Sequence, residues 1–254
     1  ANGVVMGKVL LIACTNVGRH IIKEIEENKS IQSELVGVVN LNAKQSISKA
    51  NYDSYADLAV RYPLDIHYCN NVNDAETMEF ICSKKPDIIL QSGWSQKFSD
   101  ALLQVPTFAC IGEHPAPLPR GRGAACVNWA LLTGETEWGD SFFRMMSEYD
   151  KGELYAQARF DIRQDDTVFT VYEKVAMAAR KIVCENLDDW TAGQFTATAQ
   201  DDSQATHYKR RRPTDGEIFS FDQPARVIHN FVRAQTNPYP GAYVTLSGSK
   251  IKLL

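Results

Sequence analysis

The sequence predicts an α/β protein with a mostly parallel, Rossmann-like sheet, helices on both of its faces, and a small C-terminal subdomain of a helix and a β-hairpin. First, apolar runs of strand length alternate with segments of helical periodicity along the first half of the chain. Second, successive strand-like runs lie roughly 20 to 30 residues apart, which leaves room for a helical crossover. Third, 254 residues with 44% hydrophobic and 23% charged side chains fit one large domain with a small appendage.

The N-terminal half is predicted element by element from the period of its apolar residues. Short apolar runs indicate buried strands, whereas apolar residues that recur three or four positions apart indicate amphipathic helices. One helix begins near Val17, and another is capped by Asp74 and stopped by Pro86. The predicted strands are 8–14, 35–41, 64–69, 87–91 and 108–111, and further helices are predicted at 55–62 and 98–105. Residues 1–5 are predicted to be irregular.

The second half is predicted to contain a helix at 124–132, a long packing helix over 168–190 closed by Gly193, and a polar linker at 196–205. A helix at 224–234 and two short strands joined at 247–249 follow. We therefore divide the chain into a main domain, 1–205, and a C-terminal subdomain, 206–254. Because two strands alone are marginally stable, the hairpin at 242–254 must pack on the main domain or pair with another chain.

Composition disfavours several classes of partner. The net charge of −4 provides no general attraction to nucleic acid or to anionic membranes. No apolar stretch is long enough to cross a bilayer and no signal peptide is visible, so we expect a cytoplasmic protein. The six cysteines form no C-x-x-C pair, which predicts reduced core residues and no metal site. The first strand–helix turn lacks G-x-G-x-x-G, which disfavours a nicotinamide dehydrogenase.

The loop at 112–123 carries the clearest chemical signal. Parallel sheets bind ligands beyond the carboxyl ends of their strands, so the residues after 90 and after 111 are where a site is expected. Three prolines and three glycines fix this loop, and His114 stands at its entrance.

Residues 114–123, HPAPLPRGRG, resemble the H-P-S-L-L-P-x-x-R-G signature of formyltetrahydrofolate-dependent formyltransferases. Residues 128–135 resemble the N-W-A-I-x-x-G-E segment of the sugar N-formyltransferase branch. Residues 145–153 resemble M-D-x-x-x-D-T-G-D, whose second aspartate corresponds to Asp150. Similar segments at 165–167 and 211–242 extend the resemblance over 8–254.

The resemblance implies that His114 and Asp150 are catalytic and that N10-formyltetrahydrofolate is the cosubstrate. Formyl transfer to an amine needs a group to accept the amine proton and a donor to the oxyanion that forms at the formyl carbon. A histidine held by a carboxylate can fill these roles. The resemblance further implies folate contacts at Leu118 and Arg120, and the position beyond the strand that ends near 90 adds Gln91 and Gly93. Candidate acceptor contacts are Asn128 and two aromatic residues whose rings can stack on a nucleotide base, Trp94 and Tyr239.

One position departs from the family pattern. The family has an asparagine two residues before the histidine, and this chain has Gly112. Either Asn128 or Gln91 reaches into the site instead, or bound substrate and water fill the gap, or activity is weakened. Glu113 is a candidate substitute base, but strand alternation would point it away from the face that His114 uses.

The favoured acceptor is the primary amine of a nucleotide-linked amino sugar. Glycinamide-ribonucleotide formyltransferases generally lack the C-terminal tail, and initiator-tRNA formyltransferases are more basic with a full C-terminal barrel. Both remain alternatives, as does a nucleotide-sugar binding domain that has lost turnover.

The cations at 209–212 are interpreted as a linker that pairs with carboxylates. Unpaired hairpin edges favour a homodimer.

Overall fold

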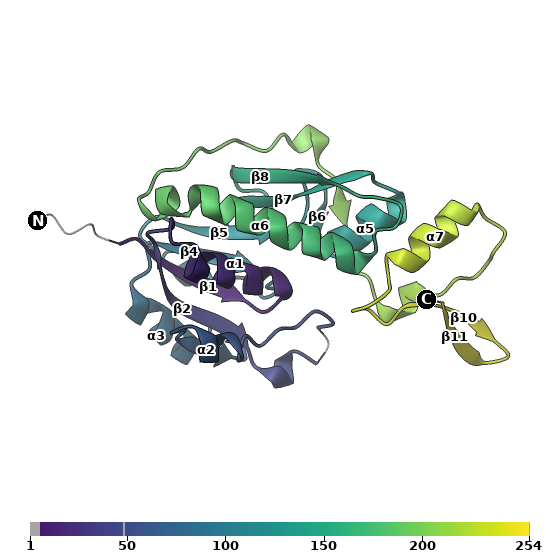
Figure 1. Ribbon diagram of the computed structural model, residues 1–254, viewed down its shortest axis with the longest axis horizontal. Helices are drawn as coiled ribbons and strands as arrows, with labels where there is room; N and C mark the ends of the chain where they lie inside the picture. Colours follow the sequence, from purple (N-terminus) through teal and green to yellow (C-terminus); the bar gives the residue numbers. More distant parts are fainter. Residues whose placement is uncertain (1–5, 48, 254) are drawn as a thin grey trace, which may run out of the picture.

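The computed structural model describes residues 6–47 and 49–253, so the predicted lead at 1–5 and the last hairpin residue, Leu254, lie outside the described residues. A central sheet is covered by α1 and α6 on one face and by α3 on the other (Figure 1). The predicted α/β class with helices on both faces and a small C-terminal subdomain is confirmed.

The central sheet has seven strands in the order β3-β2-β1-β4-β5-β7-β8. β1 to β5 are parallel, whereas β5 pairs with β7 and β7 with β8 in antiparallel register. β7 and β8 were not among the predicted strands. The seven strands are β1 (Lys8–Ala13), β2 (Glu34–Leu41), β3 (Ile66–Cys69), β4 (Ile88–Ser92), β5 (Ala109–His114), β7 (Glu137–Arg144) and β8 (Leu154–Asp161).

The helices occupy the predicted segments with shifted ends. The Asp74 carboxylate accepts a hydrogen bond from the Thr77 amide, which confirms the predicted cap. Gly193 adopts φ +78° just past the long helix, a conformation that glycine adopts without strain. The helices are α1 (Asn16–Glu27), α2 (Leu58–Arg61), α3 (Ala75–Lys84), α4 (Asp100–Leu103), α5 (Cys126–Thr133), α6 (Val168–Thr191) and α7 (Ala225–Arg233).

Alternate residues of the strands feed two separate cores. Leu11, Leu90 and Ile111 pack with α1, α5 and α6, while Ile12 and Cys110 pack with α3 and α4. Side chains alternate along a strand, so neighbours in sequence enter opposite cores. By this alternation, Glu113 shares the α6 side of β5 with Ile111, and His114 lies on the other side.

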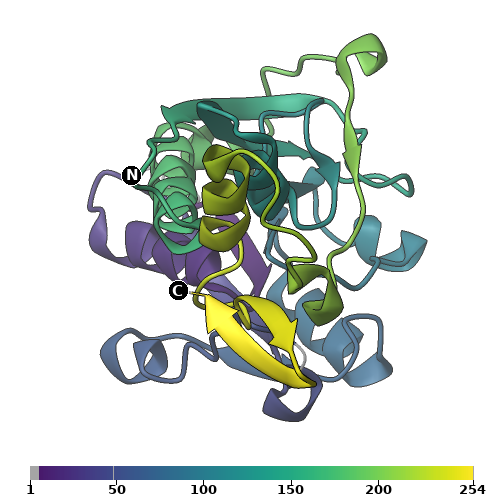
Figure 2. The ribbon, with the colours of Figure 1, turned by 90° about the vertical axis from the view of Figure 1, so that its right-hand side faces the viewer.

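The C-terminal part of the chain crosses the carboxyl edge of the sheet. A short parallel pair joins β6 (Arg122–Gly123) to β9 (His207–Tyr208), and α7 then contacts α5. The hairpin of β10 (Ala242–Leu246) and β11 (Ser249–Leu253) extends from this region (Figure 2). The hairpin packs on its own small core with α7, so the subdomain stabilises the hairpin.

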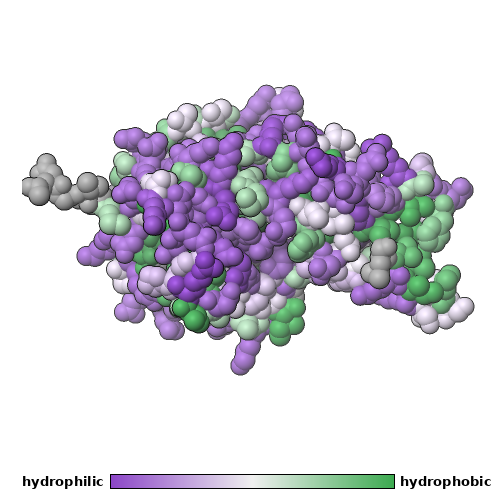
Figure 3. Space-filling model, viewed as in Figure 1, coloured by the Kyte–Doolittle hydropathy of each residue, from purple (hydrophilic) through white to green (hydrophobic). Residues whose placement is uncertain are grey.

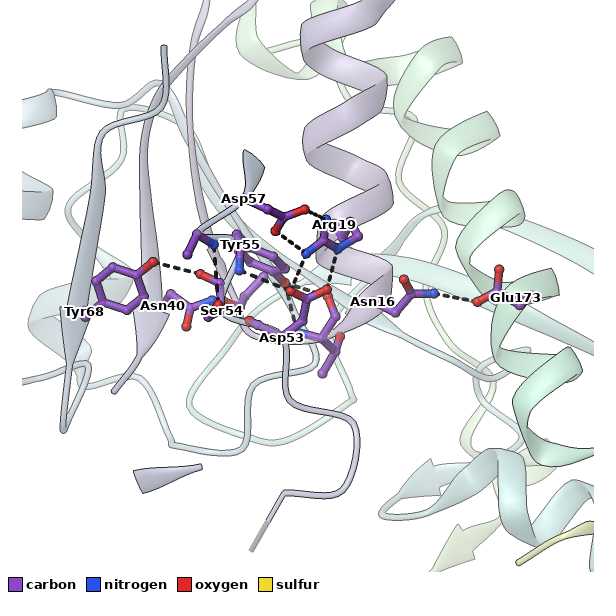
Figure 4. A network of polar contacts seen from close by, with 12 residues as sticks. Asn16, Arg19, Asn40, Asp53, Ser54, Tyr55, Asp57, Tyr68 and Glu173 are labelled. Carbon is purple, nitrogen blue, oxygen red and sulfur yellow. Dashed lines mark hydrogen bonds and ion pairs between the residues drawn. The ribbon is translucent and has the colours of Figure 1, made fainter. Parts of the chain in front are cut away.

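A polar network holds the loop after β2 against α1 (Figure 4). The Arg19 guanidinium donates to the carboxylates of Asp53 and Asp57 at 2.5–2.7 Å. These contacts lower the pKa of Asp57 to about 2. The Tyr55 hydroxyl donates to the Thr15 carbonyl at 2.6 Å. The loop thereby becomes a fixed wall beside the end of β1.

The cysteine prediction is correct in part. All six cysteines are free, and four are buried, but Cys82 and Cys184 are exposed because they lie on the solvent side of their helices. Within 6–47 and 49–253 no group of three potential metal ligands is found. No helix of these described residues is long and apolar enough to cross a membrane.

Candidate active site

A cavity of about 1220 Å³ lies over the carboxyl ends of the parallel strands. Thr15 follows β1, Gln91 is the penultimate residue of β4, and Glu113 and His114 are the last two residues of β5; all four line the cavity. Its opposite wall comes from the C-terminal segment. The volume exceeds the usual range for one small ligand, so the cavity has room for two. The location is the one expected for a parallel sheet.

His114 is fixed by hydrogen bonding and is 8% exposed. Its Nε2 lies 2.7 Å from the Gly121 carbonyl, and since a carbonyl only accepts, Nε2 carries a proton. The other nitrogen, Nδ1, lies 3.9 Å from Asp150 Oδ1. That separation is too long for a direct hydrogen bond, so Asp150 acts on the ring through its charge.

The surroundings of His114 favour its charged form. Burial acts against protonation, but interactions with the Cys126 side chain, the Asp150 carboxylate and the Gly121 carbonyl outweigh it and raise the pKa of His114 to about 10. The ring is therefore an imidazolium at neutral pH, which can donate to a developing oxyanion.

Asp150 is held in an unusual backbone conformation. Its φ is +55°, in the left-handed region that non-glycine residues seldom adopt. Its Oδ2 accepts from the Gly123 amide at 2.9 Å, and its carbonyl accepts from Gln200 Nε2 at 2.8 Å. Two separate segments thus hold the carboxylate towards His114.

Arg122 and Gln200 support Asp150, a role for Gln200 that the sequence analysis missed. Gln200 Nε2 also donates to the Gly152 carbonyl at 2.8 Å, while its Oε1 accepts from Arg122 at 2.9 Å. The Arg122 side chain is 2% exposed and pairs with Asp202. Arg122 is therefore a buried, paired charge and not a solvated surface residue. Gln200 lies in a small, polar linker where no periodicity marks it.

The structure brings most of the expected site residues to the cavity but not all of them. Leu118 is buried in the core, with its amide donating to Ser141, and Arg120 pairs with Glu135. Neither lines the cavity, so the structure does not bring them to the site, and the folate contacts expected of them stay predictions. The expected residues that do line it are His114, Asp150, Gln91, Gly93, Trp94, Asn128 and Tyr239.

The space beside Gly112 is occupied by another side chain. A Cβ at Gly112 would lie 2.8 Å from the Phe143 ring, so an asparagine would displace that ring. Gln91 donates to the Trp94 carbonyl, and Asn128 donates to the Ala234 carbonyl. Each of the two proposed substitutes therefore already has a backbone partner for its amide group.

Sequence reasoning treated Glu113 as a weak candidate and missed Asp140. Both are buried, and Ser92 Oγ donates to Glu113 Oε2 at 2.6 Å. An available signal was the acidic residue at 140 inside the apolar strand that includes Trp138 and Phe142. Although strand alternation turns Glu113 away from His114, the cavity extends around the end of β5, and both side chains line it.

Cations surround the cavity mouth. Lys49, Lys97, Arg210 and Arg212 contribute to the lining, and Arg210 and Arg212 are exposed. The four cations of the 209–212 run were predicted to pair with carboxylates. That prediction is wrong for the described residues, where no cation of 209–212 forms an ion pair. Arg211 instead bonds to the Gln235 side chain.

A Rossmann-like sheet with a histidine and a carboxylate over its strand ends has the arrangement of an α/β enzyme that uses acid–base chemistry. Comparison with protein families assigns the chain within that class: residues 8–187 match the formyl transferase family, and residues 212–254 match the formyl transferase C-terminal domain. The chain belongs to the formyltetrahydrofolate-dependent formyltransferase family.

Solved structures share its fold. A 4-N formyltransferase from Francisella tularensis is 19% identical with a TM-score of 0.75, and the match covers 98% of this chain and 97% of that one. WlaRD, a sugar 3N-formyl transferase crystallised with dTDP and 5-N-formyl-THF, is 16% identical with a TM-score of 0.69 over 97% and 85%.

HypX from Aquifex aeolicus, solved in complex with tetrahydrofolic acid, is 17% identical with a TM-score of 0.67. That match covers 95% of this chain but 36% of HypX, so the chain spans just over a third of that protein's length. At these identities the likeness establishes the fold.

Proposed function

We propose that this chain transfers a formyl group from N10-formyltetrahydrofolate to the primary amine of a nucleotide-linked amino sugar. The observation that carries the proposal is the His114–Asp150 pair, 3.9 Å apart, inside a cavity large enough for a donor and an acceptor together. Family membership supports the donor, and the cavity supports a second ligand.

The residues act on charge and protons. The Gly121 carbonyl fixes the ring of His114, so that the protonated Nδ1 donates to the formyl oxygen as negative charge develops there. Asp150 stabilises the imidazolium and accepts a proton, directly or through water, as the carbon–nitrogen bond forms. A buried site strengthens both interactions because water is excluded.

Two observations favour a nucleotide sugar as the acceptor. The cations at the cavity mouth, including Lys49 and Arg210, match the negative charge of a diphosphate. The solved relatives that match over most of their own length include a 4-N formyltransferase and a sugar 3N-formyl transferase with dTDP. We propose Trp94, Asn128 and Tyr239 as acceptor contacts, and Gln91 with Gly93 as donor contacts.

The test is a panel of 3-amino and 4-amino sugars linked to dTDP, UDP, GDP and CDP, each incubated with N10-formyltetrahydrofolate. We expect tetrahydrofolate release with at least one member. Gly112 motivates a second candidate, a nucleotide-sugar binding domain without turnover. Tight binding of a panel member without release from any of them would favour that candidate.

We also propose a homodimer that forms through the C-terminal hairpin. Ala242 and Val244 on one face of β10 are buried, but the same face is exposed towards the hairpin tip at Leu246 and Ile251. Apolar side chains gather over this hairpin in the space-filling view (Figure 3). A second copy of the same hairpin offers a self-complementary apolar face.

A further inference from the structure

Two buried carboxyl groups beside the reaction site have no part in the mechanism above. Glu113 in β5 is 5% exposed and Asp140 in β7 is 0% exposed. In the antiparallel pair of strands, Glu113 lies opposite Phe142, two residues from Asp140. Glu113 lines the cavity, whereas Asp140 lies behind it. Acidic side chains are seldom buried to this degree without a partner or a function.

The two carboxyl groups share one proton. Burial and then the adjacent Glu113 raise the pKa of Asp140 well above its usual value, so Asp140 stays protonated and donates to Glu113. Ser92 Oγ donates to Glu113 Oε2 at 2.6 Å, so Glu113 is the hydrogen-bond acceptor for both Ser92 and Asp140. The pair therefore carries one negative charge, and it lies on the side that borders the cavity.

Over 6–47 and 49–253, no basic side chain pairs with either carboxyl, and Glu113 Oε1 has no donor besides the shared proton. The other titratable groups around the pair are Cys126 of α5 and Tyr172 of α6, which supply no positive charge, and the adjacent His114, whose charge faces Asp150. An unmatched buried charge destabilises the fold, so its position on a ligand cavity points to a cation supplied by the ligand.

We propose that Glu113, supported by Asp140, binds the ammonium group of the acceptor and takes one of its protons. The inference rests on the proposed function and assigns the site of the amine. One N–H bond of the ammonium breaks and an O–H bond forms at Glu113, so the amine becomes neutral and the pair holds two protons. The nitrogen lone pair then attacks the formyl carbon beside His114, and the extra proton later returns to solvent.

Burial favours this proton transfer because it converts an ion pair into two neutral groups. It also explains how the chain can use an amine that is protonated at neutral pH. Tyr172 does not interfere with the titration, because burial raises the pKa of its hydroxyl well above the usual value.

The test compares isosteric variants with the panel acceptor that the wild type formylates. Glu113→Gln removes the charge, and we expect kcat/KM for the acceptor at pH 7 to fall at least about 10²-fold. The deficit should shrink as the pH rises through the pKa of the acceptor amine, because the amine then binds already neutral. Asp140→Asn keeps a donor to Glu113 and leaves its charge, so we expect a loss of at most about tenfold.

Glu137→Gln serves as the matched control, because it removes an exposed carboxylate from the same strand as Asp140. It should retain the wild-type rate. Equal losses in Glu113→Gln and Asp140→Asn, or a Glu113→Gln loss that does not change with pH, would overturn the proposal. If Glu113→Gln does not fold, Glu113→Asp, which draws the charge back from the cavity, should lose at least about tenfold at pH 7; a wild-type rate would overturn the proposal.

Infrared spectroscopy separates this inference from the proposed function. The wild type should show a protonated-carboxyl band at neutral pH that disappears in Asp140→Asn, whether or not any acceptor is formylated. A wild type that formylates no acceptor contradicts the proposed function, whereas the absence of this band contradicts the shared proton.

Discussion

His114 and Asp150 are 36 positions apart in the sequence, and both face one cavity. We expect His114→Ala and Asp150→Ala each to lower the rate at least about 10²-fold, because each removes a proton-transfer or oxyanion-stabilising group. Steady-state kinetics with the panel acceptor measures the loss, and circular dichroism checks the fold.

His229→Ala, at an exposed position of α7, is the matched control and should keep the wild-type rate. Near-normal turnover in either site variant would rule out the mechanism proposed for the pair.

The raised pKa of His114 makes stability depend on pH. Its pKa is about 10 in the folded chain and 6.5 ordinarily, so folding favours the protonated ring. This contribution is complete below the ordinary pKa and is lost as the pH rises through about 10. We expect the free energy of unfolding of the wild type to fall relative to that of His114→Gln across this range.

Urea unfolding of both proteins at a series of pH values measures this difference. Parallel stability curves for the wild type and His114→Gln would contradict the elevated pKa.

At the scale of elements, the site depends on a linker that crosses the sheet edge. Gln200 bonds to the carbonyls of Asp150 and Gly152, and so holds the loop that carries the carboxylate. We expect Gln200→Ala to lower kcat about tenfold to a hundredfold, because a misplaced carboxylate weakens catalysis. The KM for the folate donor should stay close to the wild-type value.

Gln204→Ala is the matched control, because this exposed glutamine of the same linker bonds only weakly to Ser203. Gln200→Glu, which cannot donate to the two carbonyls, should not rescue the rate. A Gln200→Ala variant with unchanged kcat would show that the linker does not position Asp150.

At the scale of the whole molecule, the proposed dimer depends on the exposed tip of the hairpin. We expect Ile251→Lys to shift the protein from dimer to monomer, because it places a charge in the apolar face shared with Val244. Light scattering at micromolar concentration reports the mass.

Thr245→Lys adds the same charge to the opposite face of β10 and should remain dimeric. A monomeric wild type, or a dimeric Ile251→Lys, would exclude this interface.

The division of the chain into a main domain, 1–205, and a C-terminal subdomain, 206–254, stays a prediction.

Periodicity determined much of the fold from the sequence alone. The five apolar runs became β1 to β5, and the spacing of Val171, Val175 and Ile182 anticipated α6, because buried elements are selected for local apolar patterns. Motif order identified the family and brought His114 and Asp150 forward. β7 and β8 were missed, because the buried polar residues Asp140 and Ser141 interrupt the apolar pattern of β7 and because β8 is only partly buried.

Contacts between distant segments were decided only by the tertiary structure. The burial of Leu118, the pairing of Arg120 with Glu135 and the support of Asp150 by Gln200 depend on residues far apart in the chain. So does the pair formed by Glu113 and Asp140, which meet because β5 and β7 are neighbours in the sheet. The sequence determined which side chains could do chemistry, and packing decided which of them meet, because proximity in a sheet follows strand order and not chain order.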